Sequence, residues 1–562
     1  MIQRSLLFDQ QFAGFLTRLS RLSGGEAGRF EFLIAELSAA LTAGHSCLMI
    51  DASDEKLLSV IPHLVSDTAA TPLVLQDRCL YLQRYFCYEQ QLAGQLLAMA
   101  EQAPVMLDCD EQLDRCFPPE PGEKISDQRR AAELALSRHL ALIAGGPGTG
   151  KTSTVVKILG LLLALQGTDT AIALAAPTGK AAMRLQESIA SQRNDLPFAD
   201  EICERIPAGV FTLHRLLGVR RHAVSFRYDQ NNPLPWDVVV VDESSMIDLA
   251  LMSKLVDALK PGARLILLGD RDQLSSVESG AVFGDCVAAL PASLVELLRT
   301  YRFERHIKEL SLAVNQGSAE AAWQMLVRYG DDSGILSGLL TGSLYEQIGG
   351  RIEPYLRLAG SISPGDGDAM AGLFRQLRSF QVLCAVRHGR SGVAAVNEGV
   401  ERYLRARGYD CPSGDWYAGR PVMIRRNDYR LELYNGDVGI CLPDPDSSAG
   451  FRVWFEGQGE QLRSFASARL PEAETVYGMT VHKSQGSEFE EVLLLLPDHD
   501  LPVLSRELIY TAITRAKRVI RVSALREIFC TAISRQAVRM SGLRARLGRE
   551  KAGSFLQQSP EN

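Results

Sequence analysis

The sequence has 562 residues and a formal net charge of −7. A chain of this length exceeds what one hydrophobic core supports, so we expect three or four domains, and the net charge gives no indication of nucleic-acid binding. The acidic excess lies at the front of the chain, where residues 1–120 hold 16 acidic and 8 basic residues. The rest of the chain holds 51 acidic and 52 basic residues. An acidic surface binds a phosphate backbone poorly, so we expect any nucleic acid to bind behind residue 120.

The cysteines and the apolar stretches favour a reducing, aqueous compartment. The 11 cysteines are scattered and form no Cys-x-x-Cys pair, which is typical of free thiols in the cytosol. The first residues lack the long apolar core of a signal peptide. The longest apolar stretches, Ile158–Leu165 and Val492–Leu496, are too short to span a bilayer. We therefore expect a cytoplasmic protein.

Residues 1–120 are predicted to form a mainly helical domain. Short apolar runs at residues 73–75 and 80–82 can pair as strands, and residues 85–100 show a helical period. A boundary is expected at residues 116–122, where three prolines and a glycine prevent regular structure. Nothing in this region carries recognisable chemistry, so a packing or docking module is favoured over a catalytic one.

A glycine-rich motif after residue 144 is the strongest functional signal. It lies between residues 139–144, an apolar run predicted as a buried strand, and residues 152–166, predicted as a helix. Glycine lets the backbone curl until its N–H groups point at phosphate oxygens, and the helix N-terminus adds positive charge. The alternative is a glycine-rich turn without a ligand. The motif consists of Gly145, Gly146, Pro147, Gly148, Thr149, Gly150, Lys151 and Thr152.

Two adjacent carboxylates form the second signal. The four valines at residues 238–241 predict a strand buried on both faces, and Asp242 and Glu243 follow it directly. Asp242 at the carboxyl end of the strand can hold Mg²⁺, and Glu243 can orient or deprotonate an attacking water. The alternative is an acidic helix cap after a core strand, and the P-loop motif upstream makes that alternative less favoured.

Two further apolar strands are predicted to end in polar loops. The first loop holds Pro177, Thr178 and Lys180, and the second holds Gln273. Ligands gather at the carboxyl ends of the strands in doubly wound sheets, and the Gln273 amide would lie beside the γ-phosphate. Gln128, near the start of a predicted helix, can match the donor and acceptor edge of adenine. A solvated or loop glutamine remains the alternative for each of these amides.

The second half of the chain starts with a helical, glycine-interrupted linker to about residue 378. A strand is predicted next, at residues 380–386. Residues 409–475 differ in character, since short strand-like runs separated by turn residues predict a small antiparallel β insertion, interpreted as a five-stranded barrel. Apolar runs at residues 492–496 and 519–522 predict strands of a second sheet.

From Gln128 to Lys517, the order and spacing of these motifs resemble those of superfamily 1 helicases. Two segments, Leu433–Asp437 and Thr480–Gly486, are similar to the class that translocates 5′→3′. The segments similar to the RecD branch of that class are Leu80–Glu89, Val240–Asp248 and Gly269–Leu274. The chain is therefore identified as resembling the RecD branch, the alpha subunits of RecBCD-type enzymes, which are also called exodeoxyribonuclease V.

The resemblance implies an α/β fold with two RecA-like P-loop motor domains. The first is expected at residues 121–300, with a small insertion at about 218–236. The second is expected at residues 301–530, interrupted at about 409–475 by an SH3-like β-barrel. A helical docking domain, residues 1–120, would precede them. A basic tail, residues 531–562, would follow, and its segment 535–551 is predicted to be helical with a solvated face.

The resemblance also implies roles at a nucleotide site for ATP and Mg²⁺. Gln128 would contact adenine, Thr152 and Asp242 would hold Mg²⁺, and Gln273 would couple the phosphate state to DNA. An arginine suits phosphate because its charge is permanent and its planar fork matches the oxygens. The implied catalytic residues are Lys151, Asp242, Glu243, Gln273 and the arginine fingers Arg302 and Arg515. The implied nucleotide contacts are Gln128, the P-loop residues 145–152, Gly486 and Glu488.

A groove for single-stranded DNA is implied as well, and it would join backbone contacts to stacking on rings. The residues implied to line it are Pro177, Thr178, Lys180, His214, Thr480 and His482. A two-metal nuclease needs clustered carboxylates. The acidic cluster seen in the sequence is Asp242 with Glu243, and the ATP site already uses it. The resemblance implies that the nuclease lies in a RecB-type partner and that residues 1–120 dock on a RecC-type partner.

The function expected from the resemblance is an ATP-dependent 5′→3′ DNA helicase motor, a subunit of a RecBCD-type heterotrimer that acts on double-strand ends in recombinational repair. One alternative is a stand-alone RecD-like helicase, although the additional N-terminal modules of such proteins are not found here. The other is a P-loop ATPase switch that does not translocate, for which hydrolysis would ignore single-stranded DNA.

Overall fold

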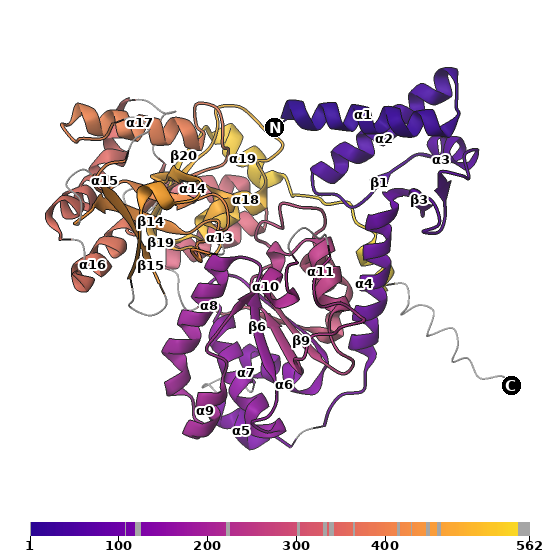
Figure 1. Ribbon diagram of the computed structural model, residues 1–562, viewed down its shortest axis with the longest axis horizontal. Coiled ribbons are helices and arrows are strands. Elements are labelled where there is room, and N and C mark those ends of the chain that lie inside the picture. Colours follow the sequence, from indigo (N-terminus) through magenta and orange to yellow (C-terminus); the bar gives the residue numbers. More distant parts are fainter. Residues whose placement is uncertain are drawn as a thin grey trace.

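The computed structural model describes most of the chain as an α/β protein (Figure 1). The described residues are 2–106, 108–118, 125–220, 225–300, 304–329, 334–335, 342–363, 366–412, 416–428, 430–445, 450–457 and 462–548. Within these ranges the strands form two parallel sheets, one mixed sheet and one antiparallel sheet. No helix in the described part of the chain is both long enough and apolar enough to cross a membrane.

The first sheet is parallel throughout, and its strands lie in the order β10-β5-β9-β8-β6-β7. They are β10 (Leu294–Leu297), β5 (Leu140–Gly145), β9 (Arg264–Gly269), β8 (Val238–Val241), β6 (Ile172–Ala176) and β7 (Phe211–Thr212). The central strands are almost continuously apolar because helices cover both faces. The predicted strands at residues 139–144 and 238–241 are confirmed, whereas the edge strand β10 was not predicted.

Helices cover each face of the first sheet. One face packs on α6 (Asp127–Ser137), α7 (Lys151–Gln166) and α8 (Gly179–Gln192), with α5 (Asp110–Cys116) and α9 (Asp200–Arg205) beyond them. The opposite face packs on α10 (Leu213–Leu217), α11 (Leu249–Asp257), α12 (Val282–Ala289) and α4 (Gln83–Glu101). The helix predicted at residues 152–166 is confirmed as α7.

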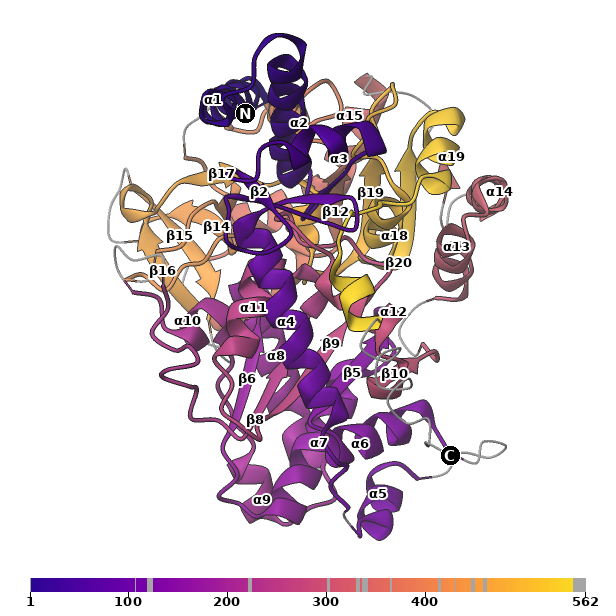
Figure 2. The same cartoon turned by 90° about the vertical axis from the view of Figure 1, so that its right-hand side faces the viewer.

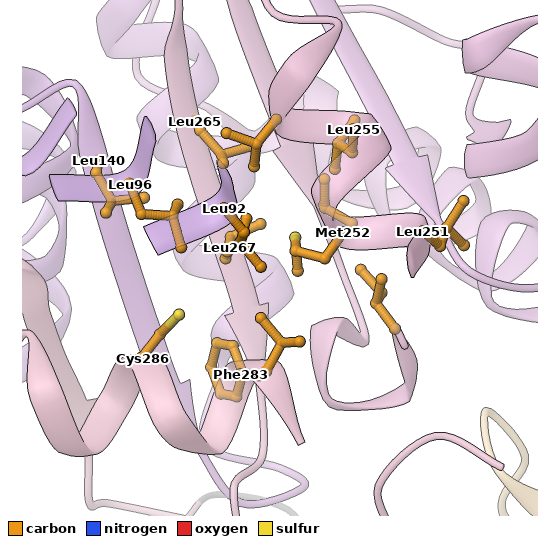
Figure 3. Packing of buried hydrophobic residues seen from close by; sticks show 14 of the residues in the cluster. Leu92, Leu96, Leu140, Leu251, Met252, Leu255, Leu265, Leu267, Phe283 and Cys286 are labelled. Carbon is orange, nitrogen blue, oxygen red and sulfur yellow. The ribbon is translucent and has the colours of Figure 1, made fainter. Parts of the chain in front are cut away.

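Helix α4 joins the front of the chain to the first sheet. Its Leu92 and Leu96 lie among Leu140, Leu265 and Leu267 of the sheet (Figure 3). Both α4 leucines have no exposed surface, and complete burial of a leucine contributes about 1.5–3 kcal/mol. The predicted helix at residues 85–100 therefore forms and is part of the core of the first sheet.

The second sheet is also parallel, with the order β11-β20-β19-β12-β18. Its strands are β11 (Gly334–Ile335), β20 (Ala516–Ser523), β19 (Phe489–Leu495), β12 (Phe380–Cys384) and β18 (Gly478–Thr480). One core contains residues of α13 (Arg305–Asn315), α14 (Ala319–Tyr329), α18 (Arg506–Ile513) and α19 (Arg526–Ser534). The other contains residues of α15 (Gly342–Ser361), α16 (Gly367–Leu377) and α17 (Val393–Ala406). The strands predicted at residues 380–386, 492–496 and 519–522 are confirmed.

The β insertion is an antiparallel sheet of five strands in the order β16-β15-β14-β13-β17. They are β13 (Pro421–Ile424), β14 (Val438–Pro443), β15 (Phe451–Glu456), β16 (Leu462–Ala466) and β17 (Ala473–Thr475). The predicted antiparallel insertion is thus confirmed, while its closure into an SH3-like barrel remains a prediction. In the smaller insertion at about residues 218–236, the described residues form only isolated bridges, such as Val219 with Phe226.

The front of the chain combines helices with a small mixed sheet. Its helices are α1 (Ile2–Ser20), α2 (Gly24–Thr42) and α3 (Ala52–Ser59), and its strands, in spatial order, are β1 (Leu48–Met49), β4 (Cys79–Leu82), β3 (Leu73–Gln76) and β2 (Val65–Ser66). The predicted strand pair is confirmed, because β3 and β4 pair antiparallel. Asp77 and Arg78 join them with φ of 54° and 62°, the left-handed values that a tight hairpin turn needs.

The segment after α19 corrects one prediction. Residues 535–542 are not helical, and Leu543 and Leu547 in the short helical turn that follows have no exposed surface. The segment runs from α19 across to α4 (Figures 1 and 2). On the way, Arg539 donates to the backbone carbonyls of Ser276 and Gly280 beside the first sheet. The predicted helix is therefore wrong for residues 535–542 and confirmed for residues 543–548, where one side is exposed and the other is buried. The buried side was not predicted, since a basic sequence gives no sign of a buried docking site.

Candidate nucleotide site

The P-loop lies between β5 and α7, at the carboxyl edge of the first sheet. Gly148 and Gly150 have φ of 76° and 83°, which side chains with a Cβ rarely adopt. A Cβ on Gly150 would lie 2.6 Å from Nε2 of Gln128. The structure therefore places the Gln128 amide, on the first turn of α6, directly against the loop.

The loop residues suit a phosphate. Lys151 Nζ donates to the carbonyls of Gly145 (2.5 Å) and Gly146 (3.0 Å), and Thr149 Oγ1 donates to Gly146 O (2.9 Å). The N–H groups of the first turn of α7 have no partner within the helix, and the residue before it, Gly150, has no side chain to cap them. A phosphate fits the charge and the donors of this loop, and Thr152 lies half-buried in the same turn.

Asp242 and Glu243 follow β8 at the same edge of the sheet. Asp242 Oδ1 accepts from the backbone N–H of Glu243 at 2.8 Å. Burial, and then the charge of Glu243, raises the pKa of Asp242 to about 6, while the Lys151 ammonium opposes this shift. Glu243 has φ of 53°, a left-handed backbone that costs about 1–3 kcal/mol in a residue other than glycine. The electrostatics fit a divalent cation, whose charge would stabilise the ionised pair.

The loop after β9 brings Gln273 into the site together with residues that the sequence reasoning missed. Gln273 Nε2 donates to Oδ2 of buried Asp270 at 2.9 Å. The hydroxyl of Tyr510, on α18 of the second sheet, donates to the same oxygen at 3.2 Å. Burial raises the pKa of Asp270, and the Lys151 charge opposes it. A Cβ on Gly146 would lie 2.9 Å from the Tyr510 hydroxyl, so Tyr510 also borders the P-loop.

Arg515 reaches the site from the second sheet. It is only 2% exposed and donates to the carbonyls of Thr511 (3.2 Å) and Ser487 (3.3 Å). Burial lowers its pKa, and the nearby carboxylates of Glu243 and Glu488 oppose that shift. The structure thus brings Arg515 to the charges at the end of β8. Arg302, the other expected arginine finger, lies outside the described residues.

Glu488 and Gly486 lie where the second sheet meets α8. Glu488 forms an ion pair with Arg184 of α8 at 3.1 Å. Gly486 has φ of 69°, and a Cβ on it would lie 3.8 Å from the backbone of Ala181. Both are therefore at the junction of the two parallel sheets. The contact with Arg184 was not predicted from the sequence.

The expected DNA residues separate into two groups. Thr178 caps α8 and Thr480 caps the turn after β18, since each hydroxyl accepts from a backbone N–H three residues along. Pro177 and Lys180 adjoin Thr178, and His482 follows Thr480. These residues lie in the two segments that meet at the junction of the sheets. His214 belongs to the first-sheet group, because it follows Thr212, which pairs with Ala176 just before Pro177, and its neighbours Phe226, Asp248 and Lys254 all come from the first sheet and its insertion.

The backbone of Leu274 ties the two sheets together. Its N–H donates to Thr511 Oγ1 at 3.0 Å, and its carbonyl accepts from Gln485 Nε2 at 2.9 Å. Sequence reasoning included Leu274 and Gln485 in the helicase-like segments but assigned no role to either residue. Asp270 could have been found from the sequence, because it directly follows a predicted apolar strand. Tyr510 could not, because a tyrosine in a helical segment looks the same as a residue that only packs.

Comparison with known proteins identifies the family. The AAA domain model matches residues 128–279, and the UvrD-like helicase C-terminal domain model matches residues 475–522. RecBCD enzyme subunit RecD of Mycolicibacterium smegmatis is 40% identical, over 94% of this chain and 96% of that protein. The chain belongs to the RecD family. The resemblance noted in the sequence is thereby confirmed.

Two further relatives of this RecD-family chain have a lower identity to it. RecBCD enzyme subunit RecD of Haemophilus influenzae is 36% identical, over 84% of this chain and 80% of that protein. The ATP-dependent RecD2 DNA helicase of Deinococcus radiodurans is 30% identical, over 81% of this chain and 56% of that protein. A solved structure of Pif1 helicase from Bacteroides with ADP-AlF3 and ssDNA aligns with a TM-score of 0.41 at 16% identity, over 77% of this chain and 97% of that chain.

Proposed function

We propose that the chain is the ATP-dependent 5′→3′ DNA helicase motor of a RecBCD-type enzyme that acts on double-strand DNA ends. Family membership at 40% identity over almost the whole length supports this function. Identity and coverage are lower for the RecD2 helicase, so a stand-alone helicase is less favoured. The observation that carries the proposal is that two residues of the second sheet reach this site, Tyr510 beside the P-loop and Arg515 near Glu243.

At the nucleotide, each side chain has a role that its chemistry supports. Lys151 and the N–H groups of the loop would bind the phosphates, and Gln128 would contact adenine. Thr152 and Asp242 would hold Mg²⁺, which when bound neutralises phosphate charge. Glu243 would accept a proton from the attacking water. The remaining contacts with nucleotide are proposed for Gln273, Arg302, Arg515, Gly486 and Glu488.

We propose that the two parallel sheets are the cores of the motor units at residues 121–300 and 301–530, with the β insertion an SH3-like barrel. The arginines belong to the second unit and the P-loop to the first, so hydrolysis requires both units to approach each other. Single-stranded DNA would lie along Pro177–Lys180, His214 and Thr480–His482. Its binding would favour the approach and thereby accelerate hydrolysis.

A RecB-type and a RecC-type subunit are the proposed partners. Large apolar side chains lie exposed on α1 and α2, where a solvated surface would favour polar residues. They are Leu7, Phe8, Phe15, Leu19 and Phe32, each between 45% and 65% exposed. We infer that this face docks on the RecC-type subunit, and that the nuclease lies in the RecB-type subunit.

Replacement of the P-loop lysine tests the nucleotide site. Lys151→Gln should abolish ATP hydrolysis, because the phosphates lose their cation. The matched control is Lys157→Gln in the same helix, whose ammonium donates to Cys116 O at 2.8 Å and lies 4.7 Å from the ring centre of Phe117. The control should lose about 1–2 kcal/mol of stability and keep its hydrolysis rate. Normal turnover of Lys151→Gln in a steady-state ATPase assay would contradict the site.

A further inference from the structure

The loop after β9 is held by four hydrogen bonds from elements of the second sheet. Tyr510 donates to Asp270, Thr511 accepts from the N–H of Leu274, Gln485 donates to the carbonyl of Leu274, and Asn315 of α13 donates to the Asp272 carboxylate. Only the first of these reaches a side chain that in turn holds Gln273. The Tyr510 hydroxyl is therefore the most direct link between the second sheet and that amide.

We propose that Tyr510 is a positioning residue for ATP hydrolysis, whose hydroxyl orients the Gln273 amide through Asp270. This inference rests on the proposed function, because a role for the Gln273 amide at the terminal phosphate is part of that function. Tyr510 itself is not proposed to touch the reacting atoms. Its action is through the shared carboxylate oxygen.

The geometry at Asp270 defines the orientation of the amide. The oxygen and nitrogen of a glutamine amide are nearly equal in size, so packing alone does not distinguish its two orientations. Oδ2 of Asp270 accepts from the nitrogen of Gln273, and Oδ1 accepts from the N–H of Asp272 at 3.0 Å. A carboxylate accepts and does not donate, so it selects the orientation with the nitrogen inward. One N–H of the amide is then held, and the other is left for a phosphate oxygen.

Tyr510 makes this arrangement depend on the second sheet. Its hydroxyl donates to the same oxygen, Oδ2, and borders Gly146 of the P-loop. If α18 moves away, the buried Asp270 carboxylate loses one of its donors, and an unsatisfied buried acceptor is costly. Arg515 lies five residues along the chain, just after the same helix. Movement of α18 therefore acts on Gln273 and on Arg515 together.

Packing alone does not account for the hydroxyl. The Tyr510 ring lies in the apolar core beside the second sheet, and a phenylalanine would fill that volume equally well. The hydroxyl instead enters a polar junction between the sheets. The Tyr355 hydroxyl is satisfied within its own unit by donating to Gly419 O at 2.9 Å, whereas the Tyr510 hydroxyl has Asn315 of its own unit and Asp270 of the other unit as partners.

The test is the steady-state kinetics of full-length Tyr510→Phe with and without a single-stranded oligonucleotide. We expect kcat with DNA to fall about tenfold, the effect of losing one hydrogen bond in the transition state, while KM for ATP stays within about threefold. Tyr355→Phe, which loses an equally buried hydroxyl, should keep both parameters. Asp270→Asn should show the same fall in kcat, and the double variant with Tyr510→Phe should be no slower than the slower single variant.

Two results would overturn the inference while the proposed function stands. One is an unchanged kcat for Tyr510→Phe in a chain whose hydrolysis is stimulated by DNA and lost in Lys151→Gln. The other is an equal fall in Tyr355→Phe, which would show a general loss of packing. A wild-type chain whose hydrolysis ignores DNA would contradict the proposed function itself and remove the basis of the inference.

Discussion

At the scale of single residues, the junction of the two sheets contains ionisable groups that are poorly hydrated. Burial is the largest cause of the pKa shift of Asp242, Asp270, Lys180 and Arg515, and each shift is toward the neutral form. Shifts of this kind cluster at functional sites, because catalysis and ligand binding use charges held away from water. A ligand of complementary charge would reverse them.

Lys180 gives a prediction for pH. Burial, and then the charge of Arg184, lowers the pKa of Lys180 to about 8. The charges of Arg378 and Arg515 lower this pKa further, whereas the Asp437 carboxylate raises it. The ammonium is therefore present below pH 8 and is lost as the pH rises through that value. If Lys180 contacts a DNA phosphate, binding above pH 8 requires uptake of a proton. The Kd for a single-stranded oligonucleotide should then rise about tenfold from pH 7 to pH 9.

The control for this prediction keeps the charge. In Lys180→Arg the guanidinium stays protonated at both pH values, so fluorescence anisotropy should give an almost constant Kd. Equal pH dependence in the wild type and in Lys180→Arg would show that another group is responsible, and would remove Lys180 from the proposed DNA groove.

Sequence reasoning located those site residues that belong to local patterns. The P-loop, Asp242 and Gln273 each follow a recognisable apolar strand, so their place at one edge of a parallel sheet could be predicted. Tyr510 and Arg184 could not be assigned, because their partners lie 240 and 304 positions away along the chain. A helical pattern shows which face is buried but not which side chain from another sheet it meets.

At the scale of elements, the C-terminal segment is the main departure from the sequence-based expectation. Arg535 pairs with Asp500 beside the second sheet, and Arg539 binds carbonyls beside the first. Farther along, Arg546 pairs with fully buried Glu89 of α4. The segment thus crosses from the second sheet to the first and on to α4 (Figure 2). Its basic residues contact acidic and carbonyl partners that are remote in sequence.

Leucine replacements distinguish a docked segment from a solvated one. Leu543 has no exposed surface and lies in the core beside α4 and α12, so Leu543→Ala should lower the free energy of unfolding by about 2–5 kcal/mol. Leu525, which is 44% exposed, provides the control, because Leu525→Ala should change stability by less than about 0.5 kcal/mol. Urea unfolding measures both variants, and equal stability of the two would mean that the segment is not docked.

Whether a segment forms a helix or a strand was more predictable than the element against which it packs. Continuous valine and leucine runs predicted the parallel strands, and turn residues between short runs predicted the β insertion. The packing of α4 on the first sheet, and of the C-terminal segment on α4, could not be predicted, because an apolar stripe fits any apolar face of matching shape. Strand β10 escaped prediction because it has only four residues, one of them Glu296.

At the scale of the whole molecule, the central claim is that one site is built by two units. The first sheet supplies the P-loop, Asp242 and Gln273, and the second supplies Arg515. Each unit has its own hydrophobic core, so relative movement of the two units need not disrupt either core. The proposed function then predicts that one unit retains nucleotide binding while hydrolysis depends on both units.

The most direct test is the ATPase rate of Arg515→Lys, measured beside its affinity for ATP. Lysine keeps the charge but lacks the planar fork. We predict a Kd for ATP within about threefold of the wild type and a kcat with single-stranded DNA at least about 10³-fold lower. Arg521→Lys is the control, since Arg521 pairs with Glu491 at 2.8 Å within the second sheet, and it should retain kcat. A wild-type kcat in Arg515→Lys would contradict a site shared by the two units.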